Sequence, residues 1–192
     1  MERRPRPRSA REPVRVIAGS RRGARLTAPR GRAVRPTSDR VREALFSILG
    51  EINGARVLDL FAGSGALAIE ALSRGAAEAT LIDSSDAAIA AIRRNLEALG
   101  LSAEVRRQRV LAFLQSARTA ARQYDLVFLD PPYRHASGLG SELSTALAPV
   151  LAPDARVIAE SDRRAPLQLE LPLLDERRYG DTLIRIYHAA TG

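Results

Sequence analysis

Beyond Gly54 the sequence alternates between short apolar runs and longer stretches with helical spacing, and this alternation constrains the fold more than any other feature. The short apolar runs predict buried strands, whereas apolar residues spaced three and four apart predict helices. Strands that alternate with helices form a parallel sheet with helices on both faces. We predict strands at residues 56–61, 79–83, 104–107, 125–129 and 156–160, and helices at 64–74, 86–99, 111–120 and 140–151.

The C-terminal part departs from this alternation. Residues 173–179 and 183–188 predict two strands with no helix between them and a turn at Gly180-Asp181. Such a pair should close the sheet as an antiparallel hairpin. The predicted fold class is therefore α/β, with a Rossmann-like sheet that is mostly parallel.

The N-terminal part has a different character. Residues 1–12 are rich in Arg and Pro and predict a disordered tail. Residues 14–18 and 24–28 predict short strands joined by a turn at 20–23, and Thr37-Ser38-Asp39 offers N-cap residues for a helix that ends at Leu49. We therefore expect a tail (1–12), a basic hairpin plus helix (13–50) and the α/β domain (51–192).

Composition narrows the class of protein. The 192 residues include no cysteine and two histidines, His135 and His188, that are far apart in sequence, which disfavours disulfides and metal catalysis. No apolar stretch approaches the ~20 residues of a membrane span, and the Arg-rich start lacks the apolar core of a secretory signal. We expect a soluble cytoplasmic protein with no membrane partner and no metal.

The positive charge is concentrated at the N-terminus. Residues 1–40 hold 13 Arg against three acidic residues, whereas the rest of the chain holds 17 Arg against 19 acidic residues. A concentrated Arg segment favours a polyanion partner held through phosphate contacts. The alternative is a set of solvated charges. Our candidate phosphate-binding residues are Arg21, Arg22, Arg25, Arg35, Arg40 and Arg42.

A glycine-rich turn follows the first strand of the α/β part and opens its first helix, in the sequence Val57-Leu58-Asp59-Leu60-Phe61-Ala62-Gly63-Ser64-Gly65. Ligands of open α/β sheets bind at such strand ends, where glycines let the backbone approach and a helix N-terminus presents unpaired N–H groups. Asp83 follows Gly63 by 20 residues, where a ribose hydroxyl would be held. A turn that only connects elements would not need this Asp.

The turn by itself fits both NAD and S-adenosylmethionine, because both contain an adenosine ribose. Two observations favour S-adenosylmethionine. Asp59 lies four residues before Gly63, where a carboxylate suits a sulfonium and an ammonium better than a pyrophosphate. The fourth strand of the series ends in a motif for which hydride transfer has no use.

That motif is Asp130-Pro131-Pro132-Tyr133, directly after the apolar run 126–129. The exocyclic amine of a nucleobase is a poor nucleophile, because its lone pair is delocalised into the ring. Asp130 and the Pro131 carbonyl could accept the amino hydrogens, since prolines fix the turn and leave its carbonyls available, and Tyr133 could stack on the base. The alternative is a loop that merely ends the strand.

With these motifs the chain resembles the class I S-adenosylmethionine-dependent methyltransferases, and more narrowly the bacterial RsmD-type enzymes that methylate N2 of a guanine in 16S ribosomal RNA. The resemblance runs from about Val14 to His188. The motifs that carry it are Arg35-Pro36-Thr37-Ser38-Asp39-Arg40-Val41-Arg42-Glu43-Ala44-Leu45-Phe46, Leu60 to Leu67, Glu70 to Ala76, Asp130 to Tyr133 and Tyr179-Gly180-Asp181-Thr182.

The resemblance implies roles for individual residues. It implies that Asp59, Gly63 and Gly65 border the methionine end of S-adenosylmethionine, that Asp83 holds the ribose, and that Asp130 and Tyr133 face the guanine. Similar proteins often carry Asp or Asn where Gln108-Arg109-Val110 stands, and Arg109 cannot accept a hydrogen bond. Adenine would then be held by backbone at Val110. The expected cofactor-binding set is Asp59, Phe61, Ala62, Gly63, Ser64, Gly65, Asp83, Ser84 and Val110.

The expected partner is small-subunit ribosomal RNA within a partly or fully assembled particle. Three other functions share parts of the pattern. A DNA adenine-N6 methyltransferase has the same turn and cofactor loop but would need a larger target-recognition region. A protein-glutamine methyltransferase would not need the basic hairpin. A ribosome-assembly RNA-binding module without catalysis would not need the intact site residues.

Overall fold

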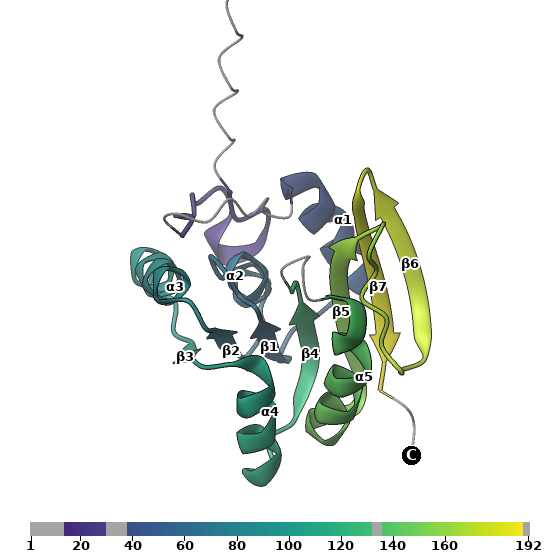
Figure 1. Ribbon diagram of the computed structural model, residues 1–192. Coiled ribbons are helices and arrows are strands. Elements are labelled where there is room, and N and C mark those ends of the chain that lie inside the picture. Colours follow the sequence, from purple (N-terminus) through teal and green to yellow (C-terminus); the bar gives the residue numbers. More distant parts are fainter. Residues whose placement is uncertain (1–13, 30–37, 132–135, 190–192) are drawn as a thin grey trace, which may run out of the picture.

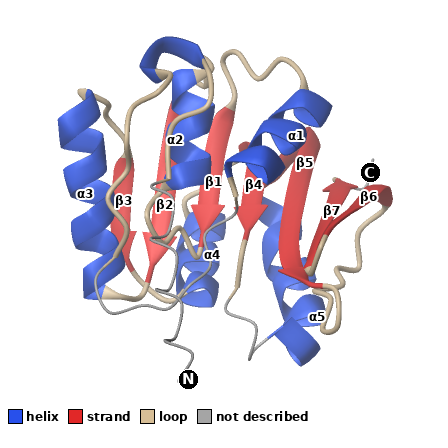
Figure 2. Cartoon of the chain, turned by 90° about the horizontal axis from the view of Figure 1, so that it is seen from above, coloured by secondary structure: helices blue, strands red, loops and turns tan. Residues whose placement is uncertain are grey.

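The computed structural model describes residues 14–29, 38–131 and 136–189 and forms a seven-stranded sheet with helices on both faces (Figures 1 and 2). The strands have the order β3-β2-β1-β4-β5-β7-β6. They are β1 (Arg56–Leu60), β2 (Glu78–Asp83), β3 (Glu104–Arg107), β4 (Tyr124–Leu129), β5 (Leu151–Asp162), β6 (Leu173–Tyr179) and β7 (Thr182–His188). β1 to β5 pair in parallel, and β7 pairs antiparallel with both β5 and β6, as predicted.

Helices cover both faces of the sheet, in two groups that Figure 2 shows on opposite sides. The first group is α1 (Asp39–Leu49), α2 (Ala66–Ser73) and α3 (Asp86–Leu99), and the second is α4 (Val110–Thr119) and α5 (Ala136–Leu147). Each face has its own hydrophobic cluster: Phe46 of α1 meets Phe128 of β4 on one side, and Leu114 of α4 packs with Leu143 of α5 on the other. Among the described residues no helix is both long and apolar enough to cross a membrane.

Capping side chains, glycines and prolines determine where the helices begin and end. The Ser38 side chain accepts a hydrogen bond from the Val41 N–H and caps α1, which has the predicted bounds. α3 ends at Gly100, whose left-handed φ of 59° suits a C-terminal glycine. α5 lies earlier in the chain than predicted, because Pro149 stands in a 3-10 turn, η3 (Ala148–Val150), after which β5 begins at Leu151.

The predicted N-terminal hairpin forms but is shorter than predicted, with the Val16 N–H donating to the Ala24 carbonyl at 2.9 Å and the Leu26 N–H to the Val14 carbonyl at 2.8 Å. Residues 14–29, here called the N-terminal segment, contain a single β-bridge between Arg15 and Arg25 and a 3-10 turn, η1 (Gly19–Arg21). The hairpin is short because α2 takes hydrogen bonds that a longer ladder would use. The N–H groups of Ile17 and Ala18 donate to the Glu70 carboxylate at 2.7 and 3.0 Å.

The N-terminal segment packs against the body of the protein. Figure 1 draws it beside α2, and its apolar side chains belong to the same hydrophobic cluster as α2 and the sheet. Gly19 fits tightly there, because a Cβ at this position would lie 1.8 Å from the Ser73 carbonyl oxygen. The apolar side chains of the segment in this cluster are Val14, Val16 and Leu26.

Candidate active site

The candidate site lies at the carboxyl ends of β1, β2 and β4. β1 pairs with β2 on one side and with β4 on the other, so the chain changes direction along the sheet between β1 and β4. Ligands of open α/β sheets bind at such a switch point. The register places Leu60 beside Leu129, so the glycine turn after β1 and the Asp130 turn after β4 leave the sheet side by side.

The turn after β1 has an unusual backbone. Phe61 has a left-handed φ of 67°, which is uncommon for a residue with a large side chain. The turn is held by the Ala62 N–H, which donates to the Ile82 carbonyl at 3.0 Å, and by the Gly65 N–H, which donates to the Ala62 carbonyl at 2.7 Å. A strained residue held by neighbouring strands is typical of functional sites.

The two glycines of this turn have different surroundings. Both have left-handed φ angles, 57° at Gly63 and 78° at Gly65. Among the described residues, a Cβ on Gly63 would meet only the Phe61 carbonyl oxygen at 3.9 Å, so this part of the structure leaves space beside its backbone for a ligand. A Cβ on Gly65 would lie 2.9 Å from the Leu81 side chain, so this glycine lets α2 begin close to β2.

Asp83 at the end of β2 ties the turn to the next strand. One carboxylate oxygen accepts the Gly63 N–H at 3.0 Å and the other accepts the Ser85 N–H at 2.8 Å. A carboxylate can accept about four hydrogen bonds, so these two contacts are compatible with a ribose hydroxyl as a further donor. Ser84 is exposed beside Asp83.

Asp59 lies beneath the turn and is 2% exposed. Its carboxylate accepts the Ala68 N–H in the first turn of α2 at 3.2 Å, which serves a helix whose N-cap, Gly65, has no side chain. Burial raises the pKa of Asp59 to about 7; the hydrogen bond from Ala68 opposes the rise and the charge of Asp83 adds to it. A cation bound nearby would therefore stabilise the ionised form of the Asp59 side chain.

The structure brings Asp130 to this edge, at the end of β4, where it is partly buried and is followed by the buried Pro131. Pro132 and Tyr133 lie outside the described residues, as does Arg35. Val110 is buried at the start of α4, next to the exposed Arg109, and the Gln108 N–H donates to the Asp83 carbonyl at 3.1 Å. The Val110 backbone is thus close to the end of β2.

The candidate phosphate-binding arginines differ in exposure. Arg22, Arg25 and Arg40 are exposed. Arg21 is partly buried, and its guanidinium donates to the Leu99 carbonyl at 2.6 Å.

The prediction that Arg42 grips phosphate is wrong, because its side chain is 0% exposed. Its guanidinium donates to the Arg15 carbonyl and the Asp39 carboxylate, each at 2.6 Å, and lies 3.9 Å from the Glu70 carboxylate. The sequence of α1 did not reveal this, because a charged residue on a helix is usually solvated.

Three buried polar residues on α2 and α3 were missed in the sequence. Glu70, Ser73 and Asn95 are at most 5% exposed and hold the N-terminal segment through its backbone. The available signal was the position of Glu70 and Asn95 on otherwise apolar helix faces, where a polar residue requires a buried partner.

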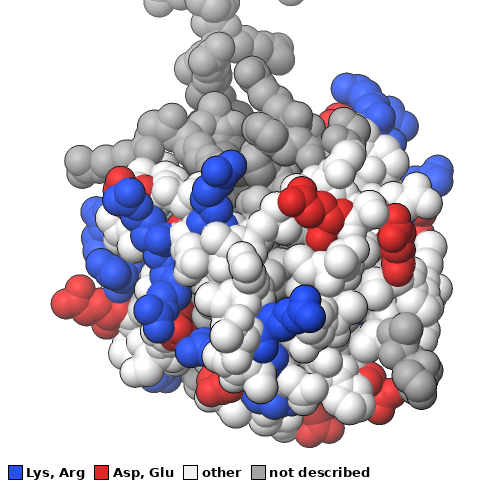
Figure 3. Space-filling model, turned by 60° about the horizontal axis from the view of Figure 1, so that its bottom comes forward, with Lys and Arg blue, Asp and Glu red and all other residues white. Residues whose placement is uncertain are grey.

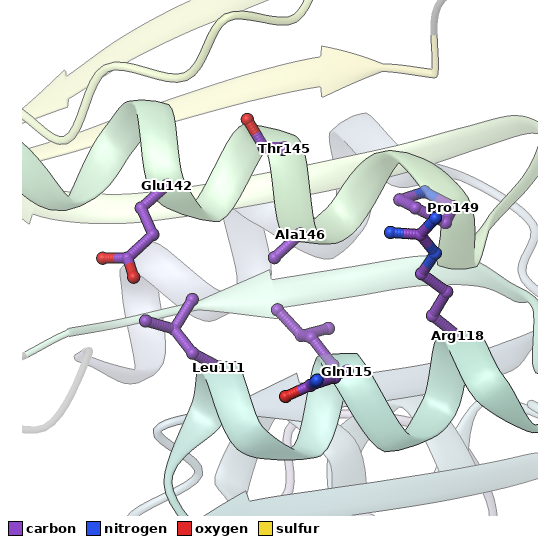
Figure 4. Close-up of a pocket in the computed structure, with 8 residues that line it drawn as sticks. Leu111, Gln115, Arg118, Glu142, Thr145, Ala146 and Pro149 are labelled. Atoms are coloured by element: carbon purple, nitrogen blue, oxygen red, sulfur yellow. The ribbon is translucent and has the colours of Figure 1, made fainter.

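A separate groove of about 440 Å³ lies between α4 and α5 (Figure 4). Leu111 and Gln115 of α4 face Glu142 and Ala146 of α5 across it, and none of the candidate site residues that the structure describes lines it. Figure 3 shows basic side chains gathered toward the β3 side of this face. Two exposed arginines of β3 are paired with carboxylates: Arg106 with Glu104 at 2.7 Å and Arg107 with Asp86 at 2.6 Å.

The fold and the arrangement of strand ends are those of the class I methyltransferases, which the comparison with solved structures bears out. The Escherichia coli protein yhhF, provisionally described as a methyltransferase, superposes with a TM-score of 0.78 at 37% identity, over 94% of this chain and 99% of that one.

Sequence comparison identifies the family. Residues 14–188 match the family described as Conserved hypothetical protein 95, and the chain belongs to this family, the RsmD family. The ribosomal RNA small subunit methyltransferase D of Escherichia coli K12 is 42% identical over 78% of this chain and 75% of its own length. That of Haemophilus influenzae is 35% identical over 93% of this chain and 95% of its own length.

Proposed function

We propose that this chain transfers a methyl group from S-adenosylmethionine to the exocyclic N2 amine of a guanine in 16S ribosomal RNA. The observation that carries the proposal is the pairing of β1 with β4, which sets the glycine turn of a cofactor site beside the Asp130-Pro131 turn. Family membership supports it, since the Escherichia coli and Haemophilus influenzae relatives are named ribosomal RNA small subunit methyltransferases.

The residues at this edge fit S-adenosylmethionine. The open space beside Gly63 admits a ligand close to the backbone, and the Asp83 carboxylate beside it suits a ribose. Asp59 is buried with a raised pKa, and a sulfonium or ammonium in the site would favour its ionised form. The Val110 backbone is the proposed contact for adenine. When bound, S-adenosylmethionine supplies an electrophilic methyl group.

Asp130 and the Pro131 carbonyl are the proposed acceptors for the two hydrogens of the guanine 2-amino group. Accepting these hydrogens concentrates the lone pair on nitrogen and stabilises the positive charge that would grow there as the new carbon–nitrogen bond forms and the methyl–sulfur bond breaks, with S-adenosylhomocysteine as the leaving group. An electrostatic contribution of this kind is worth roughly 3 kcal/mol for each well-placed group. Asp130 or water then takes the proton that the methylated nitrogen releases. Tyr133 and Pro132 complete the proposed catalytic turn, with Tyr133 stacked on the base.

The guanine must be unstacked to reach this edge. Arg22, Arg25 and Arg40 are exposed, and we assign them, together with Arg35, to the phosphates around the target. Arg21 joins them only if its guanidinium leaves the Leu99 carbonyl. The proposed partner is an RNA that is already part of a ribosomal particle, because the small basic segment offers a limited surface for naked RNA.

The test is to incubate the purified chain with labelled S-adenosylmethionine and, separately, with unmodified small ribosomal subunits, naked small-subunit RNA, DNA and protein extracts. Label in ribosomal RNA supports the proposal, and a higher rate with particles than with naked RNA supports the assembled substrate. Label in DNA or protein instead would mean that the substrate is DNA or protein and not ribosomal RNA. Binding of the cofactor without any methyl transfer would favour a non-catalytic RNA-binding role.

A further inference from the structure

Asn95 of α3 makes a buried connection between two parts of the protein that the sequence places far apart. Its side chain is 3% exposed. The Oδ1 atom accepts the Thr27 N–H at 2.8 Å, and Nδ2 donates to the Thr27 carbonyl at 3.0 Å and to the Ser64 carbonyl at 2.9 Å. One amide group therefore binds the N-terminal segment and the glycine turn together.

Both parts contacted by Asn95 belong to the proposed binding surfaces. Ser64 lies between Gly63 and Gly65 in the cofactor turn. Thr27 lies two residues after the exposed Arg25 in the N-terminal segment. Asp83 fixes the turn at the Gly63 N–H, on the β2 side, whereas Asn95 fixes it at the next residue, on the α3 side.

A buried amide makes these two contacts interdependent. If the N-terminal segment leaves, Asn95 loses both hydrogen bonds to Thr27, and its side chain is no longer held in the orientation that donates to the Ser64 carbonyl. The side chain then turns toward other partners and the Ser64 carbonyl loses its donor. An ordered turn and a docked segment therefore favour each other, which is the physical requirement for coupling between two sites.

We propose that Asn95 is a positioning residue that couples cofactor binding at the Gly63–Gly65 turn to docking of the N-terminal segment. In consequence the cofactor and RNA each strengthen the binding of the other. The coupling to RNA rests on the proposed function, whereas the coupling between turn and segment does not.

Ser73 provides a matched control, because it anchors the same segment at its other end. Its hydroxyl accepts the Arg21 N–H at 2.9 Å and donates to the Ala18 carbonyl at 2.6 Å. Neither contact involves the cofactor turn. Ser73→Ala should loosen the segment directly and leave the Ser64 carbonyl with its donor.

The experiment compares full-length Asn95→Asp and Ser73→Ala with the unaltered chain. Aspartate keeps the acceptor for the Thr27 N–H but presents no donor to the two carbonyls. Calorimetry measures the affinity for S-adenosylhomocysteine with and without naked small-subunit RNA, and circular dichroism checks the fold. Asn95→Asp should weaken S-adenosylhomocysteine binding about tenfold without RNA and abolish the mutual strengthening. Ser73→Ala should weaken RNA binding and weaken S-adenosylhomocysteine binding less than Asn95→Asp does, and RNA should still strengthen S-adenosylhomocysteine binding, because Asn95 remains in place.

Unchanged S-adenosylhomocysteine affinity in a folded Asn95→Asp protein would overturn the proposal. If the variants do not fold or if RNA does not bind, hydrogen exchange of the unaltered chain tests whether cofactor binding is coupled to docking of the N-terminal segment. S-adenosylhomocysteine should slow exchange at the amides of Thr27 and its neighbours, and an unchanged rate there would also overturn the proposal. Failure of both naked RNA and small ribosomal subunits to bind the unaltered chain would instead contradict the proposed function.

Discussion

At the scale of single residues, two carboxylates of the site are in contrasting positions. Asp59 is buried beneath the cofactor turn, whereas Asp130 is partly buried at the end of β4. Asp59 stabilises the fold by accepting the Ala68 N–H. We propose that its negative charge also attracts the cofactor. Asp130 has its proposed role only toward the substrate. Substitutions should therefore separate cofactor binding from methyl transfer.

Asp59 should make the stability of the ligand-free protein depend on pH. Its pKa is about 7 in the folded protein against 3.8 for the ordinary group, so its contribution is fully present below pH 3.8 and is lost as the pH rises through about 7. The full change is on the order of 4 kcal/mol. Asp59→Asn keeps an acceptor for Ala68 and should be relatively more stable at pH 8 than at pH 5.

Denaturant titrations of both proteins at pH 5 and pH 8 measure this difference. The same variant should bind S-adenosylhomocysteine more weakly, because the ionised carboxylate is lost. Equal pH dependence in the two proteins would mean that Asp59 does not titrate in this range.

Asp130→Ala should lower the rate of methyl transfer by roughly a hundredfold to a thousandfold, the usual effect of removing one preorganised electrostatic group. Because Asp130 is not assigned to the cofactor, S-adenosylhomocysteine affinity should stay the same. Single-turnover assays and calorimetry check the two parts. A variant with full transfer activity would remove Asp130 from the mechanism.

At the scale of elements, the N-terminal segment is held by α2 and α3 as well as by its own short strand pairing. Gly19 and Gly23 test this with a matched pair of substitutions, because both have left-handed φ angles, 80° and 83°. A Cβ at Gly19 would lie 1.8 Å from the Ser73 carbonyl oxygen, whereas a Cβ at Gly23 would have no atom of the described residues within 4 Å.

Gly23→Ala should therefore cost about 1 kcal/mol of folding free energy, the cost of the backbone conformation alone. Gly19→Ala should cost about 2 kcal/mol more and should weaken RNA binding, since the segment must move away from α2. Chemical denaturation and RNA binding measure both effects. Equal losses of folding free energy in the two variants would show that the segment does not pack against α2.

The arginines of this region should divide into two groups. Arg42→Met should destabilise the protein by about 3 kcal/mol, because it leaves buried acceptors without their guanidinium partner. Arg22→Ala and Arg25→Ala should leave stability nearly unchanged, weaken RNA binding and each lower the salt dependence of binding by about one phosphate contact. Thermal melting and salt titrations distinguish the groups. A stable Arg42→Met protein whose RNA binding depends less on salt would instead show that Arg42 contacts RNA phosphates.

At the scale of the whole molecule, the sequence predicted the order of strands and helices well, because burial on both faces leaves clear apolar runs such as 126–129 and because α3 has a regular apolar spacing. It also predicted the glycine turn and Asp83, whose spacing is local. The partners of Arg42, Glu70 and Asn95 are set by contacts between distant parts of the chain. A single sequence does not show which distant residues meet, which is why the hairpin is shorter than predicted and the role of Arg42 was mispredicted.

The most direct measurement of the central claim is the identity of the methylated nucleoside. Small-subunit ribosomal RNA labelled by the purified chain is digested to nucleosides and analysed by mass spectrometry. We predict N2-methylguanosine as the product, with the label lost in Asp130→Ala. A methyl group on another base, or at another position of guanine, would contradict the assignment of the Asp130-Pro131 turn to the guanine 2-amino group.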